Sequence, residues 1–407
     1  MQKNKYLFIV LDGAGDRKCK ELDGETPLEA AKKENIDELS KKCEFGLIKV
    51  LPYAPESDEA LLSLFGYKLQ KTYRGSFEAI GLGMEVGEKD LCFRANFATE
   101  ENGKIVDRRV ARSLTVEESK ALAKEINEKV KLENANFKFK AIGYRGAIVF
   151  SSKFKLSSSL SNTDEAYSRF KGVSIANNKK INKKTKGIPV VNCKALSKSK
   201  AAIFSANIVN SFIEKSKNVL ENSKINKIRE EEKKLKANII LLRDPCLGIP
   251  KLKKLKDIYK IKFCAIAQMP VEIGISKVLG MKIKKISEKI SYSELASIAK
   301  DSLKECDFVY LHIKGPDEFG HDGNAIGKKE CIEAIDKEFF SKIKKIKAKI
   351  AITSDHSTPC SLRAHSSDPV PFLIYPGNKK LKNFCEKECK KGIKINGNEF
   401  LRYFISK

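Results

Sequence analysis

Short apolar segments alternate with helical patterns over the second half of the chain. They occupy residues 238–242, 262–267, 308–313, 350–353 and 370–375, and a similar run covers residues 6–11 near the start. Helical patterns at 293–304 and 328–345 separate several of them. Strands that alternate with helices in this way form a parallel sheet with helices on both faces. The predicted fold class is therefore α/β, with a doubly wound, mostly parallel sheet as its core.

The pattern changes between about residues 78 and 239. Strand-like pieces at 92–98 and 140–151 are mixed there with a helix after Thr115 and a Lys/Glu-rich helical stretch at 200–236. A chain of 407 residues is long enough for more than one domain. We therefore expect an inserted α+β domain at 78–239, and a discontinuous core made of residues 1–77 and 240–407.

The net charge of +27 raises the hypothesis of a nucleic-acid or acidic-polymer binder. Most of the basic residues are lysines spread over the whole chain, and tryptophan is absent. A nucleic-acid surface usually combines a basic patch with stacking aromatic residues, and no such stripe is found. Nucleic acid is therefore not expected as a ligand, and this class of function stays as an alternative.

Compartment and membrane contact are also constrained by composition. No apolar run approaches the length of a membrane span. Residues 1–5 lead straight into the first apolar run, so no signal peptide is expected. The 11 cysteines are scattered without a Cys-x-x-Cys pair, which is typical of free thiols in a reducing compartment. We expect a soluble cytoplasmic protein without membrane contact, and the sequence leaves its oligomeric state open.

Acidic residues and histidines gather behind the apolar runs. The chain has only four histidines, and three of them lie in clusters with aspartates: Asp317 with His321, Asp355 with His356, and His365 shortly after. Asp12, Asp317 and Asp355 each follow an apolar run, and ligands of open parallel sheets gather outside the carboxyl ends of the strands. Because imidazole and carboxylate suit Mn, Zn, Fe or Mg, the sequence predicts a site for two divalent metal ions.

Ser57 is the candidate nucleophile, since it opens a predicted helix. Free N–H groups and the dipole at a helix start favour a bound phosphate, and a metal ion on the serine oxygen would activate it. Taken alone, Ser57 is equally an ordinary helix cap.

Five of the few arginines crowd into one stretch: Arg94, Arg108, Arg109, Arg112 and Arg145. A planar guanidinium grips carboxylate or phosphate through two parallel hydrogen bonds. A surface salt bridge is the alternative for any one of them.

A set of motifs in fixed order runs along nearly the whole chain, at residues 11–16, 24–30, 57–60, 77–79, 93–99, 107–109, 314–324, 354–356 and 365–371. Together they resemble the alkaline phosphatase superfamily. More narrowly, the chain is similar to the archaeal-type cofactor-independent (2,3-bisphosphoglycerate-independent) phosphoglycerate mutases, isomerases of glycolysis and gluconeogenesis.

The resemblance implies roles for individual residues. One metal ion would be held by Asp12, Ser57, Asp355 and His356, and a second by Asp317, His321 and His365. Mn²⁺ is favoured, and Zn²⁺, Co²⁺ or Mg²⁺ are alternatives. Ser57 would form a phosphoserine with 3-phosphoglycerate and return the phosphoryl group to the 2-hydroxyl. The inserted domain would close over the phosphoglycerate. The candidate substrate-binding residues are Arg108, Arg109, Arg112, Arg145 and Lys314.

The chain departs from the family pattern at three places. Glu56 precedes the serine where glycine is usual, and Tyr144-Arg145 stands where a His-Arg pair is expected. The Gly-Arg-Gly motif expected after the nucleophile helix reads Tyr-Arg-Gly-Ser at residues 73–76. The alternatives within the superfamily are a phosphatase, a phosphopentomutase or a small-alcohol phosphotransferase. These would share the metal ligands, so the arginines distinguish them.

Overall fold

The computed structural model describes residues 4–68, 71–170, 173–176, 187–287 and 289–406. The chain forms two compact units. The first unit comprises Met1–Leu69, Lys253–Gln268 and Leu279–Lys407, and the second comprises Gln70–Leu252 and Met269–Val278. The second unit is thus wider than the insertion expected at 78–239, and it takes in a short later segment as well. Among the described residues, no helix combines the length and apolar character needed to cross a membrane.

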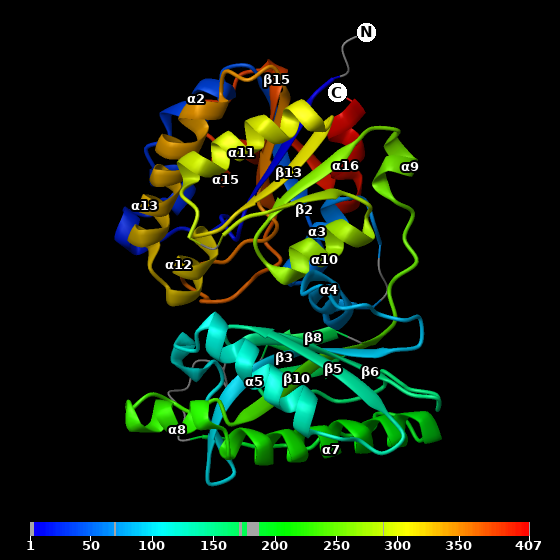
Figure 1. Cartoon of the computed structure of the whole chain (residues 1–407). Coiled ribbons are helices and arrows are strands. Elements are labelled where there is room, and N and C mark those ends of the chain that lie inside the picture. The colour runs from blue at the N-terminus through cyan, green and yellow to red at the C-terminus, as the bar shows by residue number, and fades with distance from the viewer. Residues whose placement is uncertain (1–3, 69–70, 171–172, 177–186, 288, 407) are drawn as a thin grey trace. The chain divides into compact units, whose positions relative to one another are not determined.

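The first unit is built on an eight-stranded sheet in the order β12-β11-β13-β1-β14-β15-β2-β16 (Figure 1). Strands β12, β11, β13, β1 and β14 run parallel to one another, and β15 is antiparallel to both of its neighbours. The predicted α/β class with a mostly parallel sheet is therefore confirmed. The strands are β1 (Tyr6–Leu11), β2 (Cys43–Lys49), β11 (Phe263–Ala267), β12 (Lys282–Lys285), β13 (Phe308–Ile313), β14 (Lys349–Thr353), β15 (Val370–Lys379) and β16 (Ile393–Asn396).

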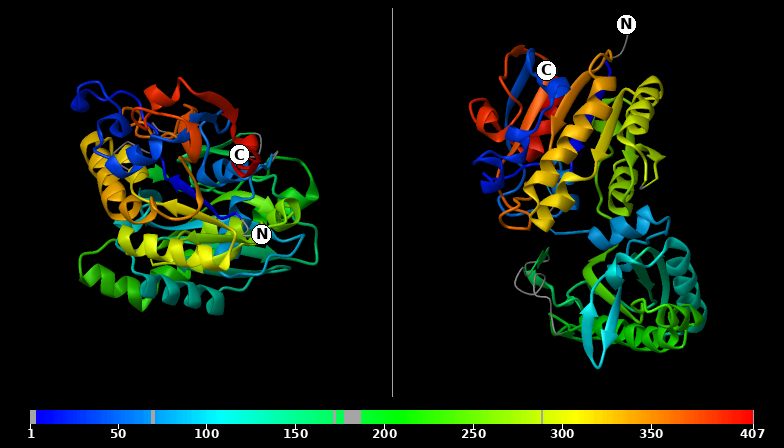
Figure 2. Two further views of the ribbon diagram at one scale, coloured as in Figure 1. Left: turned by 90° about the horizontal axis from the view of Figure 1, so that it is seen from above. Right: turned by 90° about the vertical axis from the view of Figure 1, so that its left-hand side faces the viewer.

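Helices cover both faces of this sheet (Figure 2). The helices of this unit are η1 (Lys20–Leu22), α1 (Pro27–Ala30), α2 (Glu34–Ser40), α3 (Ser57–Leu64), α9 (Leu255–Tyr259), α11 (Tyr292–Glu305), α12 (Pro316–Asp322), α13 (Ala325–Ile335), the π-helical turn η3 (Asp336–Phe340), α14 (Ser341–Ile343), α15 (Glu386–Cys389) and α16 (Gly397–Ser406).

Strand β1 shows how the two faces arise. Leu7 and Ile9 join the apolar core that also contains residues of α11 and α13. The alternate residue Phe8 packs against Phe400 and Phe404 of α16 on the other face. Because successive side chains of a strand point to opposite faces, an unbroken apolar run fits a strand that is buried on both sides.

One local prediction for the core was wrong. Residues 238–242 were expected in the core sheet, but they belong to β10 (Ile239–Leu247), which pairs antiparallel with a strand of the second unit. An apolar run shows that a strand is buried and carries no information on which sheet it joins. The segment after Thr26 forms two helices, α1 and α2, because Ala31 leaves helical geometry after α1.

The second unit holds a six-stranded sheet in the order β5-β6-β3-β4-β9, with β10 also paired to β3, and every pairing is antiparallel. A separate hairpin is formed by β7 and β8. The strands are β3 (Leu91–Glu101), β4 (Lys104–Asp107), β5 (Asn136–Ile142), β6 (Arg145–Ser151), β7 (Tyr167–Phe170), β8 (Val173–Ala176), β9 (Ile188–Pro189) and β10. The helices are α4 (Arg74–Gly81), η2 (Val110–Arg112), α5 (Val116–Lys129), α7 (Lys200–Glu221), α8 (Lys224–Glu231) and α10 (Pro270–Val278).

Helix α10 belongs to the second unit because it packs very closely on α4. A methyl group on Gly274 would lie 1.9 Å from the carbonyl oxygen of Phe77, and one on Gly81 would lie 1.8 Å from that of Pro270. Both contacts are to backbone atoms, which cannot move aside as a flexible side chain can. The two glycines therefore allow the backbones of α4 and α10 to touch.

We predict that Gly274→Ala destabilises the protein by about 1–3 kcal/mol, the usual range for forcing extra volume into a packed core. The sign of the stability change is informative, because in a solvent-exposed helix the same substitution would stabilise the protein by about 1 kcal/mol. Thermal and urea unfolding measure the change, and Asn218→Ala on the exposed face of α7 is the control. A Gly274→Ala protein as stable as the wild type would show that the two helices are not in backbone contact.

Candidate metal centre

Three adjacent strands of the first unit deliver the predicted acidic residues to one edge of the sheet. Asp12 directly follows β1, and Asp355 follows β14 by two residues. Asp317 lies in the first turn of α12, shortly after β13. Because β13, β1 and β14 are neighbours and parallel, their carboxyl ends meet at the same edge. The expected convergence of these segments is present in the structure.

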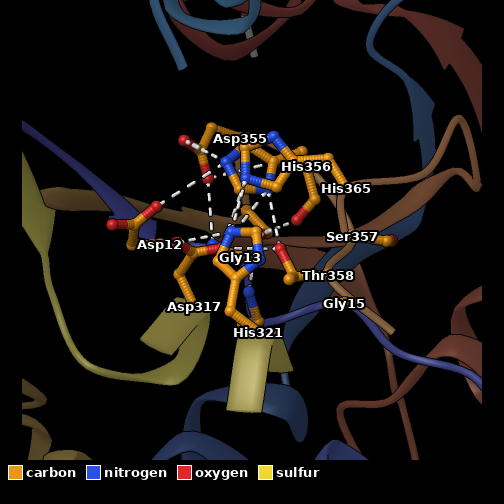
Figure 3. A network of polar contacts seen from close by, with 12 residues as sticks. Asp12, Gly13, Gly15, Asp317, His321, Asp355, His356, Ser357, Thr358 and His365 are labelled. Atoms are coloured by element: carbon orange, nitrogen blue, oxygen red, sulfur yellow. Dashed lines mark hydrogen bonds and ion pairs between the residues drawn. The ribbon is translucent and has the colours of Figure 1, made fainter. Parts of the chain in front are cut away.

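Asp12, Asp355 and His356 form one buried group of potential ligands (Figure 3). His356 Nε2 lies 3.3 Å from Asp355 Oδ2 and 3.7 Å from Asp12 Oδ1. The same three atoms are buried and have no hydrogen-bond partner. The other oxygen of Asp355 accepts hydrogen bonds from the backbone N–H groups of Gly13 and His356, which fixes the carboxylate.

Asp317, His321 and His365 form a second group. His321 Nε2 and His365 Nε2 are 3.2 Å apart, and each lies 3.5 Å from an oxygen of Asp317. His365 Nδ1 donates a hydrogen bond to the carbonyl oxygen of Pro55, so its Nε2 is the atom turned toward the group. The side chain of His321 is 43% exposed, whereas those of Asp317 and His365 are mostly buried.

The two groups are adjacent. The rings of His356 and His365 stack with their centroids 3.7 Å apart, as Figure 3 shows. His356 Nδ1 also lies 4.0 Å from Asp317 Oδ1. All six aspartates and histidines predicted as ligands are thus brought together by the fold.

Local charges shift the pKa values of these side chains. Burial favours the neutral form of Asp12, but Lys314, His312 and His356 outweigh it and hold its pKa well below the ordinary value. Burial disfavours the charged form of His365, yet its contact with Asp317 raises its pKa to about 10. Burial lowers the pKa of His356. The Asp12 carboxylate is therefore charged and ready to bind a cation.

The donor set fits divalent metal ions. Leaving a polar atom buried without a partner costs about 1–3 kcal/mol, and more for a charged group. Asp12 Oδ1, Asp355 Oδ2 and His356 Nε2 are three such atoms, all within 4.8 Å of one another, and one cation would satisfy all of them. Oxygen and imidazole ligands suit Mn²⁺, Zn²⁺, Co²⁺ and Mg²⁺ and do not distinguish among them.

Ser57 is the first residue of α3, as predicted from the sequence, and it is half-buried. Two residues earlier, the carbonyl oxygen of Pro55 accepts the hydrogen bond from His365. The turn that carries Ser57 is therefore attached to the second ligand group. The preceding Glu56 forms a capping box with Glu59 and so takes part in the start of the helix.

The predicted substrate residues divide between the two units. Lys314 lies in the first unit, where its Nζ donates a hydrogen bond to Asp12 Oδ2 at 2.8 Å. Arg108 in the second unit grips the buried Asp164 with Nε and Nη2. Arg145 packs over the Tyr144 ring, and Arg112 is exposed. The structure thus brings Lys314 into contact with a ligand group of the first unit.

Buried arginines absent from the predicted site residues gather in the second unit. Arg74 and Arg94 share the carboxylate of Glu78, at 3.0 and 3.6 Å. The Arg243 guanidinium lies over the Tyr167 ring, where Arg108 also packs. Burial together with Arg243 and Arg74 lowers the pKa of Arg94 to about 10. The sequence pattern that could have pointed to Arg243 is its place as a charged residue directly after the apolar run 238–242.

His312 is a second residue that the sequence analysis passed over. Its side chain is fully buried near the end of β13, with Nε2 at 3.6 Å from Asp12 Oδ1 and 3.5 Å from Asp355 Oδ2. Its Nδ1 lies 3.4 Å from Lys314 Nζ. The sequence pattern that could have pointed to His312 is a histidine inside an apolar run, shortly before the cluster of Asp317 and His321.

Comparison with known proteins agrees with the resemblance found in the motifs. Residues 41–226 match the family model described as 2,3-bisphosphoglycerate-independent phosphoglycerate mutase. The enzyme of that name from Aeropyrum pernix is 38% identical over 393 residues, covering 91% of this chain and 90% of its own length. The one from Sulfurisphaera tokodaii is 36% identical and covers 100% of this chain and 98% of its own length.

Two solved structures match over the full length. A protein from Pyrococcus horikoshii is 30% identical with a TM-score of 0.78, covering 100% of this chain and 97% of that one. The cofactor-independent phosphoglycerate mutase from Thermoplasma acidophilum is 26% identical with a TM-score of 0.64, covering 99% of both chains. With relatives above 30% identity over nearly the whole chain, this protein belongs to the family of 2,3-bisphosphoglycerate-independent phosphoglycerate mutases, which are isomerases.

Proposed function

We propose that the chain interconverts 3-phosphoglycerate and 2-phosphoglycerate through a phosphoserine on Ser57, beside two divalent metal ions. The observation that carries this proposal is the group of Asp12, Asp355 and His356, which holds three buried atoms without hydrogen-bond partners and lies beside the group around Asp317. The turn carrying Ser57 is bonded to one of these groups through Pro55 and His365. Asp12, Asp355, His356 and Ser57 would hold one ion, and Asp317, His321 and His365 the other.

The bond changes at Ser57 follow from the reaction class. Ser57 Oγ forms a bond to phosphorus while the bond between phosphorus and the 3-oxygen of the substrate breaks, which leaves glycerate with a free 3-hydroxyl. After glycerate turns, its 2-hydroxyl attacks the phosphoserine and Ser57 is released. When bound, the metal ions supply charge neutralisation for the transferring phosphoryl group and lower the pKa of an oxygen nucleophile.

The start of α3 supports the phosphoryl group in this proposal. Ser57 is the first residue of an eight-residue helix, where backbone N–H groups lack partners within the helix. These groups and the helix dipole favour an anion on the serine oxygen. Lys314 Nζ adds a positive charge next to Asp12. Phosphoryl transfer needs such positioning and charge stabilisation more than it needs covalent help from the protein.

Arginines of the second unit are proposed to bind the substrate carboxylate and phosphate. From the residues predicted by sequence we keep Arg109, Arg112 and Arg145. Arg108 is left out because its guanidinium already donates hydrogen bonds to Asp164. We add Arg243, which is buried, and Arg94, whose side chain is 13% exposed and whose pKa is lowered by burial together with Arg243 and Arg74. A dense group of buried positive charges is stabilised by an anion. Closure of the second unit over the substrate and a cytoplasmic location stay predictions.

The direct test of this function is conversion of 3-phosphoglycerate to 2-phosphoglycerate without added bisphosphoglycerate. We expect activity in the purified protein, its loss after treatment with a chelator, and its return on addition of Mn²⁺. Free phosphate as the only product would favour a phosphatase of the same superfamily. Activity that survives complete metal removal would contradict the proposed centre.

Substitution of the nucleophile gives a second prediction. Ser57→Ala removes the oxygen that accepts the phosphoryl group, so mutase activity should be abolished while the fold and most of the metal content remain. Ser63→Ala in the same helix is the matched control, since its hydroxyl only donates to the Val50 carbonyl. This control should lose about 1 kcal/mol of stability and keep its activity. Retained activity in Ser57→Ala would exclude Ser57 as the nucleophile.

Metal binding should also release protons. His365 has its pKa raised to about 10 in the metal-free protein, and a histidine must be neutral to bind a metal ion. Near neutral pH the ion therefore displaces a proton, and the apparent affinity should rise as the pH increases toward that value. Calorimetric titration with Mn²⁺ in buffers of different ionisation enthalpy measures the released protons. Identical enthalpies in all buffers would contradict the prediction.

A further inference from the structure

The hydroxyl group of Thr358 lies between the two ligand groups of the proposed metal centre. Thr358 is fully buried in the loop that follows β14. Its Oγ1 donates a hydrogen bond to Asp317 Oδ1 at 2.7 Å and lies 3.0 Å from His356 Nδ1 (Figure 3). One side chain thus contacts one predicted ligand from each group.

The chemistry of the Thr358 hydroxyl, the Asp317 carboxylate and the His356 imidazole determines where the protons lie. A carboxylate only accepts hydrogen bonds, so the single proton of the Thr358 hydroxyl points to Asp317. The oxygen then has only lone pairs left for His356, and Nδ1 of that imidazole must donate. In a neutral imidazole a proton on Nδ1 leaves the lone pair on Nε2. His356 Nε2 is the buried atom that faces Asp12 Oδ1 and Asp355 Oδ2.

We infer that Thr358 is a positioning residue that holds His356 in its metal-binding tautomer and orients Asp317 at the same time. This inference rests on the proposed function for its metal ions, whereas the tautomer can be measured without them. A partner on the second ring nitrogen is what usually sets the orientation of a metal-binding histidine, and its loss commonly weakens metal binding about 10- to 100-fold. Here one hydroxyl would serve ligands of both ions.

The backbone of Thr358 is held firmly, so its hydroxyl is fixed in place. Its N–H donates to the carbonyl oxygen of Gly15 at 2.9 Å. Its own carbonyl accepts a hydrogen bond from Lys328 Nζ, which also donates to Gly15 and to Asp16 Oδ2. Lys328 is fully buried, and these three acceptors match its three donors. The loop after β1 and the loop after β14 are thereby joined beside Thr358.

Glycine residues make room for this arrangement. A methyl group on Gly13 would lie 2.6 Å from Asp317 Oδ1 and 2.7 Å from Thr358 Oγ1, so a side chain there would collide with the hydrogen bond itself. Gly13 also has a φ of +58°, which other residues rarely adopt. A methyl group on Gly320 would lie 2.4 Å from the Thr358 carbonyl oxygen. A side chain at Gly13 or Gly320 would therefore displace Thr358 or Asp317 from these contacts.

The test compares Thr358→Val, which keeps the shape and removes the hydroxyl, with Thr358→Ser, which keeps the hydroxyl. Thr353→Val is the matched control, because the buried Thr353 hydroxyl donates to the Pro371 carbonyl and contacts no predicted ligand. Chelator-treated proteins are titrated with Mn²⁺ by calorimetry. We expect Thr358→Val to weaken both binding steps about 10- to 100-fold. Thr358→Ser and Thr353→Val should stay close to the wild type.

Nitrogen-15 NMR of histidine-labelled protein measures the tautomer directly, since the chain has only four histidines. The His356 signals are identified by their loss in His356→Gln. We expect the metal-free wild type to carry the His356 proton on Nδ1, and Thr358→Val to lose that preference. If Thr358→Val does not fold, the wild-type tautomer and Thr358→Ser still decide the question.

Three outcomes would overturn the inference. They are a wild-type His356 with its proton on Nε2, unchanged Mn²⁺ binding in Thr358→Val, and a Thr358→Ser protein that binds as weakly as Thr358→Val. Failure of the proposed function looks different. In that case the wild type binds no divalent ion, while His356 still carries its proton on Nδ1.

Discussion

The parallel pairing of β13, β1 and β14 is the constraint on which the rest of the site depends. It places Asp12, Asp355 and Asp317 at one edge of the sheet, although they are far apart in the sequence. Carboxylates brought together in a buried place repel one another and lose their hydration. In the metal-free chain Lys314 and the histidines compensate this charge in part. Two divalent cations would do so more completely, which is why the site and its metal ions are best understood together.

The arginines proposed to bind the substrate belong to the second unit. In the second unit, arginines on an antiparallel sheet and its helices are largely buried, and they pair with carboxylates such as Glu78 and Asp164. Buried cations gain from nearby anions, and the proposed substrate, a phosphorylated carboxylic acid, would supply two more anionic groups. The proposed metal ligands and the proposed anion-binding arginines therefore belong to different units.

The sequence predicted those features that depend on local pattern. Apolar runs such as 308–313 and 350–353 became strands of the sheet, and the aspartates behind them met because parallel strands share an edge. The pattern did not assign residues 238–242 to the right sheet, because burial is the same in both. It also missed His312 and Thr358. A histidine in an apolar strand and a threonine in a loop look ordinary until the fold shows which atoms they face.

Anomalous diffraction from crystals grown with Mn²⁺ tests the central claim most directly. The account predicts two strong peaks, one within bonding distance of Asp12, Asp355 and His356, and the other within bonding distance of Asp317, His321 and His365. A single peak, or peaks located away from these side chains, would contradict it.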